Sequence, residues 1–173
     1  FAGGADCFNV PDLLRSGMAS VTVCSDLLNS GGYMRMLQYF EELEAAMNEV
    51  GAVDLPDFVC KSALAGTDTA ELARLLRDAL PANSTLSGGH DEGRYLAQEV
   101  GEKPEQRAVD TLQRWGHDIG LPAGQIDAFV GNVFKAFARL NLRQYAATAR
   151  SDWRLRKESF RTDRSKTTRP LEL

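Results

Sequence analysis

One short segment of the sequence is typical of a β-strand, and the remaining apolar pattern is helical. Val21-Thr22-Val23-Cys24 is compact and β-branched, as expected of a short buried strand. One strand cannot close a barrel, and its apolar edges need cover. We therefore expect the chain to dimerise or exchange strands if it is isolated.

Helices are predicted on both sides of this strand. Residues Val10 to Gly17 form a short helix, with Asn9 in the capping position and Gly17 as the stop. Residues Tyr33 to Val50 form a longer helix. Its apolar positions are Met36, Leu37, Phe40, Leu43, Ala46, Met47 and Val50. A helix, a strand and a helix with short connections are typical of an α/β fold with parallel strands.

Beyond Gly51 the pattern predicts helices alone, so the fold class expected for the whole chain is mostly α. The predicted helical segments are 54–65, 67–80, 91–100, 104–116 and 123–150. The last one carries an apolar stripe that should bury one face of the helix. That stripe consists of Phe129, Val133, Phe134 and Phe137, and we also interpret Trp115 and Trp153 as packing residues.

Composition excludes several classes of protein. The chain has 173 residues, of which 43% are hydrophobic and 25% charged, as in soluble globular domains. It shows neither a signal peptide nor an apolar run that would span a bilayer. Three widely spaced cysteines argue against a disulfide framework and favour a reducing, cytoplasmic location. A net charge of -4 gives no reason to expect nucleic acid.

Basic residues crowd the end of the chain. They are Arg150, Arg154, Arg156, Lys157, Arg161, Arg164, Lys166 and Arg169. This segment is either a solvated, frayed tail or a docking segment for an acidic neighbour, and the sequence leaves both interpretations open.

The first 58 residues resemble a known arrangement. Their order is the pair Gly3-Gly4, a helix ending at Gly17, the strand Val21 to Ser25, and a helix carrying Glu41-Glu42-Leu43 that closes at Gly51. It resembles the C-terminal βαβα unit of the FMN-binding TIM barrels of dihydroorotate and dihydropyrimidine dehydrogenases. The turn Ser16-Gly17-Met18-Ala19 departs slightly from the alanine-glycine turn of those barrels.

A second resemblance extends to the end of the chain. The segments Asp26-Leu27-Leu28, Gly31-Gly32-Tyr33, Asn141-Leu142-Arg143 with Tyr145-Ala146, and Arg169 to Leu173 are similar to the multidomain selenate reductase subunit family. Those proteins are relatives of the glutamate synthase small subunit. The resemblance implies three parts: the end of an FMN barrel (1–58), a helical connector (59–150) and a basic tail (151–173) leading to a ferredoxin-like module.

The resemblance also implies cofactors and a site. FMN would be bound in the full-length protein, while an iron-sulfur cluster and FAD or NAD(P)H would belong to neighbouring redox domains or subunits. The FMN phosphate would lie against Gly3, Gly4, Cys24 and Ser25, because loops at the carboxyl ends of the last barrel strands commonly hold a phosphate. Glycines let the backbone approach it, and exposed N–H groups donate to its oxygens. No catalytic residue is expected here, because the catalytic base of such barrels lies in an earlier loop.

The remaining candidate residues have ordinary structural interpretations. A Cys at the end of a buried strand acts as a small hydrophobe, so we expect no catalytic role for Cys24, nor for Cys7 or Cys60. Asp6 and Asp26 are interpreted as loop caps rather than site carboxylates. His90 and His117 are separated by a helix and have no neighbouring ligands, which argues against a metal site and favours loop or surface positions.

Two other hypotheses stay open at this point. Residues 66–150 and the basic tail could form a helical protein–protein interaction module without a cofactor. The basic tail could also bind nucleic acid, although it offers few aromatic side chains on which bases would stack.

Overall fold

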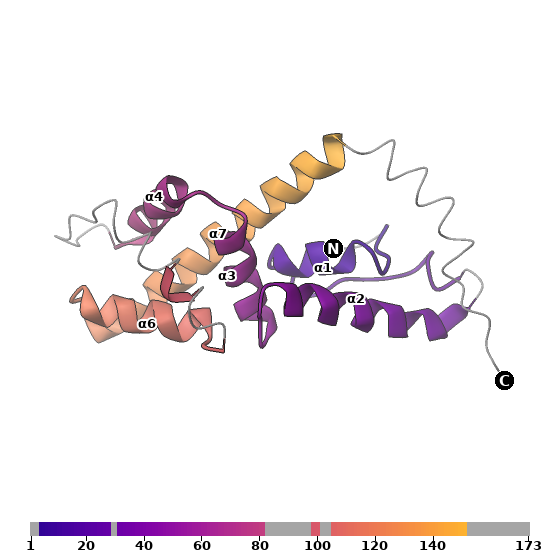
Figure 1. Cartoon of the computed structure of the whole chain (residues 1–173), viewed down its shortest axis with the longest axis horizontal. Coiled ribbons are helices and arrows are strands. Elements are labelled where there is room, and N and C mark those ends of the chain that lie inside the picture. Colours follow the sequence, from indigo (N-terminus) through magenta and orange to yellow (C-terminus); the bar gives the residue numbers. More distant parts are fainter. Residues whose placement is uncertain (1–3, 29–30, 82–97, 101–104, 152–173) are drawn as a thin grey trace.

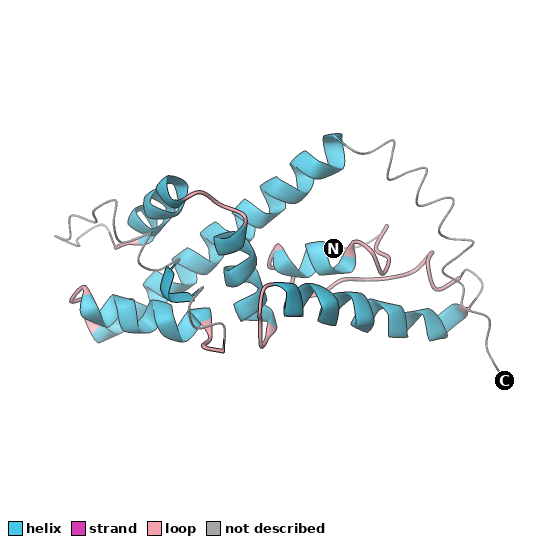
Figure 2. Cartoon of the chain, viewed as in Figure 1, coloured by secondary structure: helices cyan, strands magenta, loops and turns pink. Residues whose placement is uncertain are grey.

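The computed structural model describes residues 4–28, 31–81, 98–100 and 105–151 (Figure 1). Its helices are α1 (Val10–Arg15), the 3₁₀ helix η1 (Gly32–Arg35), α2 (Met36–Glu49), α3 (Leu55–Ala65), α4 (Thr69–Ala79), α6 (Ala108–Asp118) and α7 (Ala123–Ser151). Figure 2 shows these helices joined by loops. The fold is therefore mostly α, as the sequence predicts.

The predicted strand is wrong for the chain taken alone. Within the described residues no β-strand forms, and Thr22 makes only an isolated bridge in an otherwise irregular segment. A strand is stabilised by the hydrogen bonds of a ladder, and the described helices provide no partner strand. The β-branched side chains instead turn toward a helix, because Val21 and Val23 pack against the small apolar cluster next to α1.

Helix starts follow the capping residues of the sequence. Asp54 accepts a hydrogen bond from the Asp57 N–H at 2.9 Å and begins α3. Asp68 accepts from the N–H groups of Ala70 and Glu71 and begins α4. Helix α6 begins at Ala108, later than predicted. Each cap satisfies N–H groups that have no partner within the helix.

The main core lies between α3, α4, α6 and α7. Its largest buried side chains include Phe58, Phe129, Phe137, Leu72, Leu76 and Leu112. Trp115 stacks obliquely on Phe129, with ring centroids 5.3 Å apart. The predicted stripe of α7 is confirmed, because Phe129, Val133 and Phe137 are buried and Phe134 packs against the same cluster.

A smaller cluster lies between α1 and α2. It consists of Ala5, Cys7, Val10, Leu13 and Tyr39. Helix α1 also packs against α3 and α7, which joins this region to the main core (Figure 1). The junction includes Asn141, a buried residue of α7 whose amide nitrogen donates to the carbonyl oxygens of Arg15 at 2.7 Å and Val59 at 2.9 Å.

The apolar face predicted for α2 is largely uncovered. Met36, Leu37 and Phe40 are exposed, Phe40 by 63%, while Tyr39 is the buried residue of this helix. Helical periodicity shows which residues share a face, but burial also requires a neighbouring element to cover that face. The described residues cover only the side of α2 that carries Tyr39.

Several predictions lie outside the described residues. Most of the predicted helix 91–100 is among them, although residues 98–100 are helical. So are His90, Trp153 and the tail 151–173, apart from the backbone of Ser151 at the end of α7. Among the described helices, none combines the length and apolar character needed to cross a membrane.

Candidate functional site

Two loops converge at the end of the molecule that carries the first described residues. One loop comprises residues 4–9 and leads into α1, and the other comprises residues 24–28 and precedes η1. The carboxylates of Asp6 and Asp26, one from each loop, both lie near the buried thiol of Cys7, where they contribute to raising its pKa. The structure therefore brings together the two segments that the sequence analysis assigned to one site.

The first loop is held by short-range hydrogen bonds. Asp6 Oδ1 accepts from the N–H groups of Phe8 and Asn9, each at 3.1 Å, which confirms Asp6 as a loop cap. Asn9 stands before α1 as predicted, but its side chain does not cap the helix. Its Oδ1 accepts from the Asp6 N–H, and its Nδ2 donates to the Gly4 carbonyl at 2.7 Å. These bonds fix the backbone next to Gly4.

The second loop is anchored by a buried ion pair. Arg35 Nη2 donates to Asp26 Oδ1 at 2.9 Å, and Tyr39 donates its hydroxyl hydrogen to Asp26 Oδ2 at 2.7 Å. Arg35 is 5% exposed and Asp26 is 2% exposed. Burial and the Asp26 carboxylate raise the pKa of Tyr39 well above its usual range, so the phenol remains a donor. Asp26 is thus an ion-pair partner that ties the loop to α2, rather than the predicted cap.

The surface above this network is open and offers hydrogen-bond donors. Gly4, Cys24 and Ser25 are exposed. Gly4 has φ +71° and open space where a Cβ would stand, a conformation that favours glycine. The turn at residues 24–28 uses the carbonyls of Cys24 and Ser25 as acceptors, and their N–H groups donate to no other described residue.

These features fit a phosphate held by backbone donors. A phosphate needs several N–H or O–H donors, and a glycine with positive φ lets the backbone approach closely. Gly4 has the open, positive-φ backbone, and Cys24 and Ser25 are exposed, whereas Gly3 lies outside the described residues. Arg35, the cation that anchors the second loop, is paired with Asp26. The arrangement therefore suits an anion bound through amide and hydroxyl hydrogens.

The cysteines differ from one another in their surroundings. The expectation that Cys24 is a buried hydrophobe is wrong, because the segment forms no strand and leaves it exposed. Cys7 and Cys60 are buried, as expected of small apolar side chains. Burial raises the pKa of Cys7 to about 11 and that of Cys60 to about 12. Both are therefore protonated at neutral pH.

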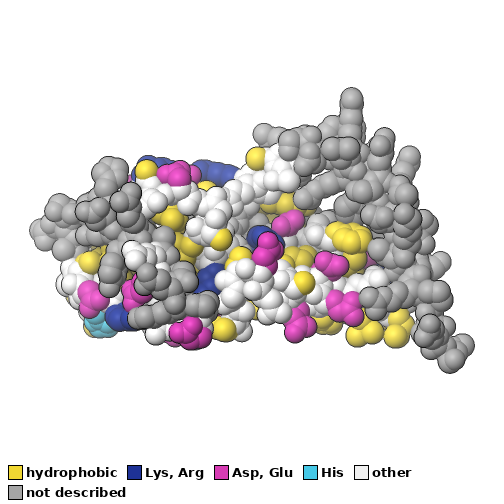
Figure 3. Space-filling model, in the orientation of Figure 1, with side chains coloured by type: hydrophobic (Ala, Val, Ile, Leu, Met, Phe, Trp, Pro, Cys, Tyr) yellow, Lys and Arg dark blue, Asp and Glu magenta, His cyan; other side chains and the backbone are white. Residues whose placement is uncertain are grey.

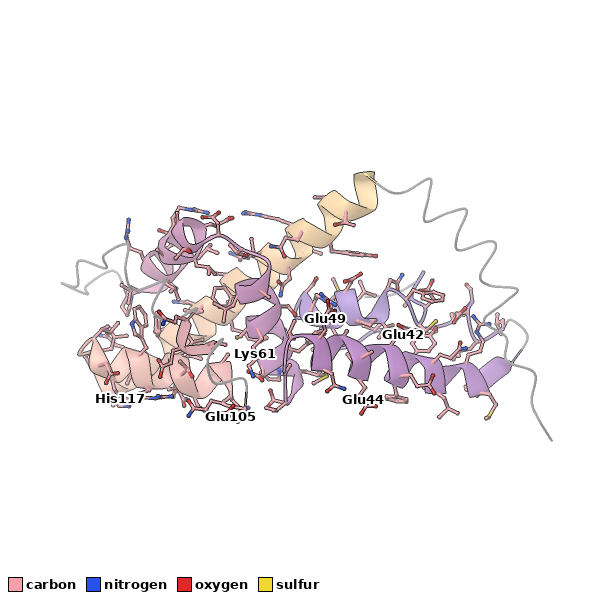
Figure 4. All side chains as sticks on the ribbon, viewed as in Figure 1. Glu42, Glu44, Glu49, Lys61, Glu105 and His117 are labelled. Carbon is pink, nitrogen blue, oxygen red and sulfur yellow. The ribbon has the colours of Figure 1, made fainter. Side chains whose placement is uncertain are left out.

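A second buried ion pair supports α3 and has a structural role. Lys61 Nζ lies 2.9 Å from Asp57 Oδ2 and donates to the Gly51 carbonyl at 2.7 Å, between α3 and the end of α2 (Figure 4). Asp57 Oδ1 also accepts from the Ala108 N–H at 2.7 Å. Sequence reasoning missed this pair, although the i, i+4 spacing of Asp57 and Lys61 was visible.

His117 lies on the surface, as predicted. It is exposed near the end of α6, well away from the two loops (Figure 4). In the part of the chain that the structure describes, no three His, Cys, Asp or Glu side chains are grouped as a metal ion would require.

Comparison with known proteins gives a family match for the first part of the chain. Residues 1–85 match the family described as "Oxidoreductase YgfK, N-terminal TIM-barrel domain". The match covers just under half of the chain, contains α1 to α4, and extends past residue 58, where we placed the end of the barrel. It supports an oxidoreductase TIM-barrel family for these residues. No curated protein and no solved structure matches the chain.

Proposed function

We propose that this chain contributes the last strand–helix unit of an FMN-binding barrel in an iron-sulfur-linked oxidoreductase, followed by a helical connector to the next redox module. The proposal rests on the match of residues 1–85 to an oxidoreductase TIM-barrel domain and on the open rim formed by the two loops. In this proposal Gly3, Gly4, Cys24 and Ser25 provide donors to the FMN phosphate.

The single observation that carries the proposal is that a loop with an exposed, positive-φ glycine and a loop with an exposed turn meet through their buried residues. Gly4 and the turn at Cys24 and Ser25 belong to loops whose buried residues meet at Tyr39. In TIM barrels, ligands bind at the loops that follow the carboxyl ends of the strands. In the proposed barrel these two loops are neighbours on that rim.

The uncovered apolar surface supports the same proposal. Leu28, Tyr33, Leu37 and Phe40 are between 57% and 82% exposed. Beside them lies an apolar groove of about 190 Å³ whose lining includes Val21. A contiguous exposed apolar surface marks a contact site. We propose that the preceding strands and helices of the barrel cover it, giving Val21 and its neighbours the strand partners that the described residues do not provide.

The roles of the residues follow from their positions. FMN, when bound, supplies the hydride- and electron-transfer chemistry of the enzyme. The backbone of Gly4 and the amide and hydroxyl groups of Ser25 bind and orient its phosphate. The Asp26–Arg35–Tyr39 network keeps the second loop in place, because both oxygens of Asp26 are engaged from η1 and α2.

The test is the substitution Gly4→Val in the full-length protein. A β-branched side chain at φ +71° is strained and occupies the space that a phosphate needs. A charge-assisted hydrogen bond contributes about 1.5–3 kcal/mol, so we expect FMN affinity to fall roughly tenfold to a hundredfold. The measurement is the flavin absorbance per polypeptide, together with titration of the apoprotein with FMN.

A matched control separates the loss of the site from backbone strain. Gly120 also has a positive φ, +79°, with open space around it, but it follows α6 away from the loops. Gly120→Val should retain FMN at the wild-type level. Retention of FMN by Gly4→Val, or equal loss in both variants, would contradict the proposed phosphate site.

A further inference from the structure

A groove with basic walls lies between α4 and α7. Its volume is about 470 Å³, in the range of binding clefts. Figure 3 shows Lys and Arg side chains gathered along the edge of the molecule over these helices. The groove lies away from the two loops of the proposed flavin site, so it does not depend on that assignment.

The basic side chains of the groove follow one line on α7. Lys135, Arg139 and Arg143 stand at four-residue intervals, are exposed, and line the groove. At a rise of about 1.5 Å per residue, the line spans roughly 12 Å. None of the three has an acidic partner within 4 Å among the described residues. These charges are available to a ligand.

The opposite wall adds a fourth cation whose charge is partly compensated. Arg74 on α4 lies 3.5 Å from Asp78 and 3.7 Å from Glu71. With Asp78 as the one carboxylate of the lining, the groove carries four cations and one anion on a chain whose formal net charge is -4. The groove is thus positively charged although the chain as a whole is acidic.

The floor of the groove is apolar. Leu75, Ala79, Ala136 and Leu140 line it between the charged rims. Ala79 and Leu140 belong to the main core, so the floor is a rigid part of the fold. A narrow apolar floor with charged rims is the form of surface on which an amphipathic helix docks.

We propose that this groove binds an acidic amphipathic helix of a protein partner. Carboxylates four residues apart on that helix repeat at the same distance as Lys135, Arg139 and Arg143, and can pair with them in register. Small apolar side chains between the carboxylates contact Leu75 and Leu140. Charge sets the orientation and the rate of association, and the apolar floor contributes to affinity.

Two other ligand classes fit the geometry less well. A compact phosphate is held by donors that converge on one point, whereas these cations are spread along a line. Single-stranded nucleic acid is bound by basic residues interleaved with aromatic ones on which bases stack. The lining of this groove contains no aromatic side chain.

The test measures binding of a synthetic probe to the whole chain. The probe is a fluorescent helix-forming peptide with Glu at four-residue intervals and Leu beside them. We expect saturable binding by fluorescence anisotropy that weakens as salt is raised. The triple variant Lys135→Glu/Arg139→Glu/Arg143→Glu should bind about tenfold more weakly or worse, since three exposed ion pairs are lost.

Two controls complete the experiment: a peptide of opposite charge, and a variant with a charge reversal outside the groove. A peptide with Lys in place of Glu should bind the triple variant more tightly than it binds the wild type. Arg77→Glu, on α4 but outside the groove, should change the affinity for the Glu peptide less than about twofold. Equal affinity of wild type and triple variant, or displacement of the peptide by pyrophosphate or an oligonucleotide at a lower concentration than by unlabelled peptide, overturns the proposal.

Discussion

Two regions of the molecule differ in how much of their apolar surface they bury. The first region is formed by α1, η1 and α2, and the second by α3, α4, α6 and α7. The second region closes a core in which Phe58, Phe129 and Phe137 are fully buried. The first buries a few side chains around Tyr39 and leaves Phe40 and Leu37 more than half exposed. Both regions consist of helices with apolar stripes, so helical propensity does not account for the difference.

The difference shows whether each region can cover its apolar helix faces with residues of its own. Four helices that pack against one another can bury the apolar face of each. The second region does this with its own residues. The first region has one long helix, one short helix and a segment with strand-like sequence, which cover only part of each other. Its exposed apolar surface is of the kind that a contact with another element covers.

The largest expected contrast comes from truncating one phenylalanine in each region. Phe129→Ala removes a fully buried side chain of α7 and should lower the free energy of unfolding by about 3–5 kcal/mol. Phe40→Ala removes a ring that is 63% exposed, and should change the stability of this chain by less than about 0.5 kcal/mol. Urea denaturation followed by circular dichroism measures both values.

The same pair of variants sharpens the comparison in the full-length protein. There, Phe40→Ala should become destabilising, because the proposed barrel covers the ring, while the effect of Phe129→Ala should stay the same. If Phe40→Ala were as harmless in the full-length protein as in this chain, α2 would be a surface helix in both, and the proposed cover would be wrong.

A smaller effect is expected at the junction between the regions. Asn141→Leu removes the amide that donates to the carbonyls of Arg15 and Val59, and leaves both without this donor in a buried place. We expect a loss of about 2 kcal/mol in the free energy of unfolding. Asn132→Leu is the control, because its amide makes one long contact, 3.4 Å, with the Ala79 carbonyl from an exposed position. Equal losses in the two variants would show that Asn141 does not hold the regions together.

A smaller loss of stability is expected from a substitution in the turn after α1. Gly17 has φ +79°, and a Cβ there would stand 2.8 Å from the Cβ of Ala138. Gly17→Ala should therefore cost about 1–2 kcal/mol by pushing α1 away from α7. Gly124→Ala, in the first turn of α7 with open space around it, should be neutral or slightly stabilising. Thermal unfolding of both variants checks this, and a neutral Gly17→Ala would contradict the close approach.

The smallest expected effect is a difference in how readily the three cysteines react with a thiol reagent. At pH 8, Cys24 should react quickly with a thiol reagent, whereas Cys7 and Cys60 are buried and burial raises their pKa to about 11 and about 12. In low urea, Cys7 should become reactive before Cys60, because the first region is less well packed. Mass spectrometry of partially labelled protein gives the order, and labelling of Cys60 first would reverse our comparison.

The pH dependence of these thiols has a defined sign. Folding raises both pKa values above the ordinary value of 9.0, so the folded chain holds its thiol protons more tightly than the unfolded chain. Their contribution to stability is fully present below pH 9 and decreases as the pH rises toward 11. Replacing Cys7 and Cys60 by Ala should make the urea midpoint less dependent on pH in this range.

Local signals in the sequence predicted most helices. Capping residues such as Asp54, the stop at Gly17, and the stripe of Phe129 and Phe137 are determined by neighbours within a few turns. The assignment of Gly3, Gly4, Cys24 and Ser25 to one site came from resemblance to barrels rather than from local pattern, and it stays a prediction. Whether these residues bind FMN stays a prediction.

Features that depend on long-range partners could not be predicted in the same way. The segment around Thr22 has strand-like sequence, but a strand forms only where another strand lies beside it. Cys24 was assigned to the interior on the basis of that strand, and is exposed because the strand is absent from the described residues. Asn141 bonds to residues 82 and 126 positions away, a pairing that no local pattern shows.

The carboxamide of Asn141 has a mechanical consequence. Its nitrogen donates both to the Arg15 carbonyl at the end of α1, at 2.7 Å, and to the Val59 carbonyl within α3, at 2.9 Å. Because α1 and α3 share this one donor, both are held to a common point on α7. The position of α1 relative to α3 is thus set in part by one amide, alongside the direct packing of α1 against α3 and α7.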